Sequence, residues 1–209
     1  MRLPLCLCAL VPRIETRTRI VLVIHRYEAR KPTNTGRLAA SCLTNSETHE
    51  RGHEGARSEH LGWDAASQPL LLFPFEGAIP LSDWPASRPV TLIVPDGTWR
   101  QTSRVRARVP GLAEIPCVTL PAGPPTRYRL RSESRHGGLA TIEAIARALG
   151  ILEGPAVQEA LERVFSVISL EGAVAPPPGL TLILYDAVDL AIEAYDARFT
   201  PEAGWWMAG

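Results

Sequence analysis

Two side chains with useful chemistry, the Asp96 carboxylate and the Trp99 indole, stand close together in the middle of the chain. Residues 90–94 form a short apolar run rich in β-branched side chains, which predicts a buried strand that Pro95 ends. Thr98 can cap a helix that begins at Trp99. The carboxylate therefore falls at the carboxyl end of a strand, the edge at which open α/β sheets bind ligands.

A second polar segment, residues 31–38, follows another predicted strand over residues 19–25. The proline in this segment disfavours helix at its start, and Asn34 or Thr35 can cap a helix over residues 36–43. The unpaired N–H groups of that helix start would suit a carboxylate or a phosphate. An ordinary loop and helix cap would give the same pattern.

The rest of the chain continues the alternation of short strands and helices. Strands are predicted over 70–73 and 116–120, a rigid proline-rich loop over 121–125, and helices over 139–149, 155–168 and 181–198. Residues 45–67 are polar and broken by glycines, which predicts a solvated loop. The spacing of His49 and His53 in that loop would suit a helical metal pair, but Gly52 disfavours the helix.

Four segments, taken in order, resemble the signature of the DTW-domain family. They are Lys31 to Leu38, Leu71 to Pro74, Asp96 to Trp99, and Tyr128 to Arg131 followed by Gly138 to Ala144. The resemblance spans most of residues 5–168. It implies a tRNA-uridine aminocarboxypropyltransferase that uses S-adenosylmethionine. It also implies a single α/β domain with a mostly parallel sheet flanked by helices and a SPOUT-like knotted topology.

The implied reaction moves the 3-amino-3-carboxypropyl group of S-adenosylmethionine to N3 of a uridine and releases methylthioadenosine. The enzyme must turn the methylene carbon toward N3 and let N3 lose a proton. Asp96 is the catalytic candidate, as a general base or as the group that orients the uracil edge. A helix cap is its alternative role. Trp99 is the second catalytic candidate, because its indole could stack on a base. A core-filling role is favoured for this side chain.

The resemblance also assigns residues to the two substrates. Those expected at the S-adenosylmethionine site are Thr35, Gly36, Phe73, Pro74, Pro95, Leu120, Tyr128 and Thr141. Those expected to contact tRNA are Lys31, Asn34, Arg37, Arg100, Arg104, Arg129 and Arg131. The last two could instead hold the cofactor carboxylate through bidentate bonds.

Charge is segregated along the chain although the net charge is zero. Residues 100–135 hold eight Arg against two Glu, whereas residues 151–209 hold two Arg against nine acids. Arg100, Arg104 and Arg108, here called the arginine row, recur at four-residue spacing, which predicts one stripe on a helix. The row could follow the phosphates of tRNA or form an ordinary solvated face. The composition therefore allows a tRNA partner, and no protein partner is predicted.

The length of 209 residues fits one domain, and no apolar run is long enough for a membrane span. We interpret residues 1–18 as the remnant of a Cys-rich segment, 19–170 as the DTW domain and 171–209 as an acidic extension with one helix. Cys6 and Cys8 form only one of the two cysteine pairs that a zinc site of such a segment would need, so zinc is not expected. We read Cys42 and Cys117 as buried apolar residues, and the chain is expected to be cytoplasmic.

Two other functions fit parts of the same pattern. A SPOUT-like RNA methyltransferase would use the same cofactor and pocket but would transfer the methyl group. A non-catalytic RNA-binding module would bind RNA without S-adenosylmethionine and would tolerate loss of Asp96.

Overall fold

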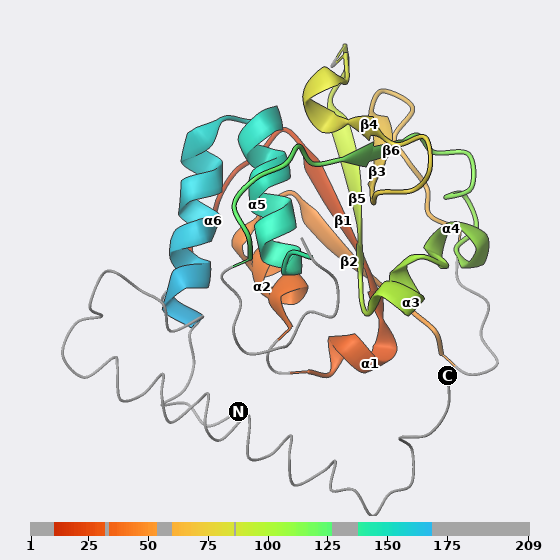
Figure 1. The fold of residues 1–209 in the computed structure, drawn as a ribbon, viewed down its shortest axis with the longest axis horizontal. Helices are drawn as coiled ribbons and strands as arrows, with labels where there is room; N and C mark the ends of the chain where they lie inside the picture. The colour runs from red at the N-terminus through yellow and green to blue at the C-terminus, as the bar shows by residue number, and fades with distance from the viewer. Residues whose placement is uncertain (1–10, 32–33, 54–59, 86, 127–137, 169–209) are drawn as a thin grey trace, which may run out of the picture.

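A six-stranded sheet forms the centre of the computed structural model, which describes residues 11–31, 34–53, 60–85, 87–126 and 138–168 (Figure 1). Its strands are β1 (Arg19–His25), β2 (Ser46–Arg51), β3 (Gln68–Leu72), β4 (Ile79–Pro80), β5 (Val90–Asp96) and β6 (Cys117–Thr119). They lie in the order β2-β1-β5-β3-β6-β4, and every strand pair of this sheet is parallel. The carboxyl ends of all six strands therefore meet at one edge of the sheet.

Alternate residues of the central strands enter two separate cores. Ile20, Leu22 and Ile24 of β1 pack in one core, and Val21 and Val23 pack in the other. All five side chains are at most 1% exposed, as expected for a parallel strand that is covered on both faces.

The helices divide between the two faces of the sheet, as Figure 1 shows. Their bounds are α1 (Arg26–Ala29), α2 (Thr35–Cys42), the 3-10 helix η3 (Leu81–Asp83), α3 (Trp99–Thr102), α4 (Val105–Arg108), α5 (Thr141–Leu152) and α6 (Pro155–Ile168). Helices α2, α5 and α6 cover the first core, and α3 and α4 lie on the opposite side. None of the helices within the described ranges is long and apolar enough to cross a bilayer.

Most of the predicted elements are present within a few residues of their expected bounds. The strand over 19–25 and the helix over 155–168 are confirmed to the residue. The expected strand at 90–94 is longer, because β5 continues through Pro95 to Asp96. Cys42 and Cys117 are buried and free, as predicted. The α/β prediction is confirmed, and the sheet is wholly parallel rather than mostly so.

The prediction of a solvated loop over residues 45–67 is wrong in its first part. Residues 46–51 form β2, which pairs in parallel with β1 from Ile20 opposite Ser46 to His25 opposite Arg51. The sequence Ser-Glu-Thr-His-Glu-Arg has no apolar periodicity because β2 is an edge strand with mostly exposed or half-exposed side chains. Backbone pairing, rather than side-chain burial, holds this strand in place.

The single helix expected after Trp99 is also corrected. The chain forms two four-residue helices, α3 and α4, that are separated at Ser103 and Arg104. The arginine row therefore does not follow one continuous helix. Its three side chains are nevertheless all exposed.

Candidate active site

A cavity of about 750 Å³ opens at the carboxyl edge of the sheet, beside the ends of β3, β5 and β6. Its size lies within the range of small-molecule sites. It is lined by Glu28, Lys31, Leu72, Phe73, Pro74, Val94, Pro95, Gly97, Thr98, Trp99, Thr102, Val118, Thr119, Leu120, residues 121–125, Leu139, Thr141, Ala144 and Arg147. The walls thus combine an apolar surface with a few hydroxyl and charged groups.

Asp96 ends β5 behind the wall of this cavity and is 6% exposed. One carboxylate oxygen accepts a hydrogen bond from Asn34 Nδ2 at 2.6 Å, and the other accepts one from Thr141 Oγ1, also at 2.6 Å. Asn34 is the N-cap of α2 and Thr141 is the first residue of α5. Asp96 therefore joins the carboxyl end of β5 to the starts of two helices.

Gly36 makes room for this carboxylate. A Cβ atom at position 36 would lie 2.8 Å from Asp96 Oδ2 and 3.1 Å from Leu22 Cδ1. Because both distances are shorter than ordinary carbon contacts, the first turn of α2 can approach β5 only without a side chain there. Gly36 thus lies against Asp96, and its expected contact with a cofactor stays a prediction.

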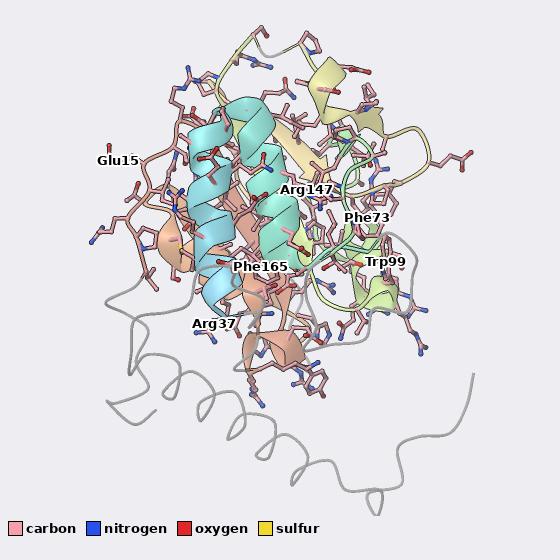
Figure 2. The ribbon with its side chains drawn as sticks, turned by 60° about the vertical axis from the view of Figure 1, so that its left-hand side comes forward. Glu15, Arg37, Phe73, Trp99, Arg147 and Phe165 are labelled. Atoms are coloured by element: carbon pink, nitrogen blue, oxygen red, sulfur yellow. The ribbon has the colours of Figure 1, made fainter. Side chains whose placement is uncertain are left out.

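Trp99 forms part of the cavity wall with Phe73. Their ring centroids are 5.1 Å apart with planes tilted by 58°, and the Phe73 ring also contacts Phe75. The two labelled side chains lie on the same side of the molecule in Figure 2. The indole is half-buried and lines the cavity, and the choice between a stacking role and the favoured core-filling role stays a prediction.

Another part of the wall carries an ion pair. Glu28 in α1 is 3% exposed, and its Oε1 lies 2.7 Å from Lys31 Nζ. Both residues line the cavity. Glu28 is not among the residues predicted for the site, because no pattern in the sequence sets it apart from other acids.

The proline-rich loop over residues 121–125 forms another side of the cavity. Arg147 of α5 donates a hydrogen bond from Nη2 to the Pro124 carbonyl oxygen at 2.6 Å. Its guanidinium is half-buried and lines the cavity (Figure 2). Arg147 was not predicted as a site residue either. It follows Thr141 and Ala144 at three-residue spacing, which places all three on one face of α5.

A family model described as the DTW domain matches residues 1–170. The chain belongs to the DTW domain family. Within this DTW domain, the signature from Asp96 to Trp99 forms the end of β5 and the start of α3 beside the cavity.

Two relatives carry the name tRNA-uridine aminocarboxypropyltransferase 2. The protein of Drosophila melanogaster is 36% identical over 98 residues, which cover 46% of this chain and 39% of that protein. The protein of Macaca fascicularis is 29% identical over 168 residues, which cover 76% of this chain and 56% of that protein. The chain thus spans about half the length of these relatives or less.

One solved structure is also similar, the SAM-dependent rRNA acp-transferase Tsr3 from Vulcanisaeta distributa. The two chains share 18% sequence identity, with a TM-score of 0.43. The similarity covers 88% of this chain and 89% of the Tsr3 chain.

The expected cofactor residues of this DTW domain fall into three groups. The cavity is lined by Phe73, Pro74, Pro95, Leu120 and Thr141. Thr35 and Gly36 are buried in the first turn of α2, outside the lining. Tyr128 lies outside the described residues.

The expected tRNA residues are more scattered. Lys31 lines the cavity, whereas Asn34 is buried and bonded to Asp96. Arg37 is exposed and donates to the Ala29 carbonyl oxygen, which ties α2 to the end of α1. Arg100 and Arg104 are exposed outside the lining. Arg129 and Arg131, like Cys6, Cys8 and the predicted helix 181–198, lie outside the described residues.

A basic group lies on the other side of Asp96 at the same sheet edge. His25 ends β1 opposite Arg51 of β2, and Arg51 is 3% exposed. Burial and then the positive charge of Arg51 lower the pKa of His25 below its usual value, and the pKa of Arg51 is itself lowered by burial and by Arg108. His25 is therefore mostly neutral at pH 7, and its Nδ1 accepts a hydrogen bond from the Tyr27 amide.

Proposed function

We propose that this chain transfers the 3-amino-3-carboxypropyl group of S-adenosylmethionine to N3 of a tRNA uridine and releases methylthioadenosine. The observation that carries the proposal is the cavity of about 750 Å³ beside the DTW signature. Membership of the family and the names of the two relatives support this reaction and a tRNA substrate. The SPOUT-like knot and a cytoplasmic location stay predictions.

The cavity fits the chemical parts of S-adenosylmethionine. The rings of Phe73 and Trp99 offer flat apolar surface for a base, and the loop over 121–125 offers a rigid wall. The Arg147 guanidinium suits the carboxylate of the methionine part. When bound, the sulfonium supplies the leaving group, and the walls orient the methylene carbon toward N3.

Transfer of the correct carbon chain can be measured with two labels. The protein is incubated with tRNA and S-adenosylmethionine labelled either in the carboxyl carbon or in the methyl group. We expect the carboxyl label to enter RNA and the methyl label to leave as methylthioadenosine. Entry of the methyl label alone would identify a methyltransferase instead, and RNA binding with neither transfer would identify a binding module.

The arginine row provides a test of the tRNA partner. Replacing Arg100, Arg104 and Arg108 together with alanine should weaken tRNA binding and reduce the slope of log K against log salt by about 2, because each phosphate contact releases counterions. Binding of S-adenosylmethionine should not change, since none of the three lines the cavity. Filter binding at several salt concentrations measures the slope.

Arg13 and Arg163 provide the matched control, because both are exposed arginines outside the cavity and outside the row. Their replacement with alanine removes two positive charges, one fewer than the triple variant, and should leave the slope nearly unchanged. An equal effect of both sets would mean that the arginine row contributes only to the general field of the protein.

A further inference from the structure

The described wall of the cavity contains one carboxylate, and it is not that of the DTW signature. Glu28 lines the cavity, whereas Asp96 lies behind it with both oxygens accepting hydrogen bonds from Asn34 and Thr141. Of these two acids, Glu28 is thus the one that can meet a substrate bound in the cavity. The two acids therefore have different tasks.

We propose that Glu28 is the group that accepts the N3 proton of the target uridine and that Asp96 is a positioning residue. This inference rests on the proposed function. Glu28 is held in α1 immediately after β1, at the edge where the strand ends meet. Glu28 is only 3% exposed. Little water would therefore compete with a bound uracil for hydrogen bonds to its carboxylate.

Lys31 completes the arrangement. Its ammonium lies 2.7 Å from Glu28 and also lines the cavity, with the side chain 27% exposed. The ammonium holds the Glu28 carboxylate in place at the cavity wall. It can also stabilise the negative charge that develops on a uracil carbonyl oxygen as N3 loses its proton.

The step balances without any further reactant. The N3–H bond breaks and the proton moves to the Glu28 carboxylate. The N3 electron pair forms a bond to the methylene carbon next to sulfur. The carbon–sulfur bond breaks, and its electron pair stays on sulfur in neutral methylthioadenosine. Glu28 then releases the proton to solvent.

The test replaces Glu28 with glutamine, which keeps the shape but cannot accept the proton. The single-turnover rate at pH 7 should fall by about 10²- to 10⁴-fold, the usual contribution of a general base. The residual rate should rise about tenfold per pH unit, because the variant depends on uridine that has already ionised. Affinity for S-adenosylmethionine, measured by calorimetry, should stay within about threefold.

A modified substrate separates base catalysis from a structural role. The N3 proton of 5-fluorouridine is more acidic, so tRNA made with 5-fluorouridine should recover a large part of the lost rate in Glu28→Gln. The gain in the wild type should be much smaller. Glu28→Asp retains a carboxylate, so its rate should lie between those of the wild type and Glu28→Gln. It replaces Glu28→Gln in the test if that variant does not fold. Glu15→Gln removes an exposed acid outside the cavity and should behave as wild type.

Two results would overturn the inference. One is a Glu28→Gln rate within about threefold of wild type. The other is a slow variant that gains nothing from 5-fluorouridine or from higher pH. If wild-type protein transfers no label to any tRNA, the proposed function itself fails, which is a different outcome from either of these.

Discussion

Replacement of Asp96 with alanine is expected to lower the free energy of unfolding by about 3 kcal/mol, because it leaves buried donors of Asn34 and Thr141 without their acceptor. The three groups connect β5 to the starts of α2 and α5 through bonds of 2.6 Å. Thr141 and the residues on both sides of Asp96 line the cavity. Affinity for S-adenosylmethionine should therefore fall together with stability.

Urea unfolding gives the stability, and calorimetry gives the cofactor affinity. Asp96→Asn is the matched control, because its amide oxygen can still accept one of the two bonds, and it should lose less stability. A double-mutant cycle with Thr141→Val should give a coupling energy of about 1 kcal/mol or more. Full stability in Asp96→Ala would show that these contacts do not hold the cavity together.

Replacement of Gly36 with alanine is expected to destabilise the protein by about 2 kcal/mol, since a crowded methyl group forces a packed site to shift. Alanine has the better helix propensity, by up to about 1 kcal/mol, which opposes the clash. The clash should win because the atom at 2.8 Å belongs to Asp96, whose carboxylate is buried and already held by hydrogen bonds.

Gly62→Ala is the control for this substitution. Gly62 has no heavy atom within 4 Å of an added Cβ atom and does not have a positive φ. Its replacement should leave the urea midpoint unchanged or slightly raised. If Gly36→Ala were as stable as Gly62→Ala, the close approach of α2 to Asp96 would not limit this position.

The sequence was sufficient to predict those elements whose side chains are buried in a regular pattern. The apolar runs of β1 and β5 and the amphipathic pattern of α6 gave nearly the right bounds. The edge strand β2 could not be predicted in this way. Its side chains are mostly polar and show no apolar periodicity, although its backbone pairs with β1. The break between α3 and α4 could not be predicted either, because the four-residue spacing of the arginine row continues across it.

The residues expected at the cofactor site only partly coincide with the lining of the cavity. Family motifs located the cavity at the ends of β3 and β5, and five of the eight expected cofactor residues line it. Which carboxylate faces the cavity depends on how side chains turn at the strand ends. Asp96 turns toward two helix starts, and Glu28, three residues beyond β1, turns to the cavity. No spacing rule distinguishes these orientations.

The most direct measurement is a crystal structure of the protein with S-adenosylmethionine. We expect the cofactor in the cavity between Trp99 and the loop over residues 121–125, with its methionine part reaching toward Glu28 and Arg147. A cofactor bound elsewhere on the protein, or a cavity still empty at saturating S-adenosylmethionine, would contradict it.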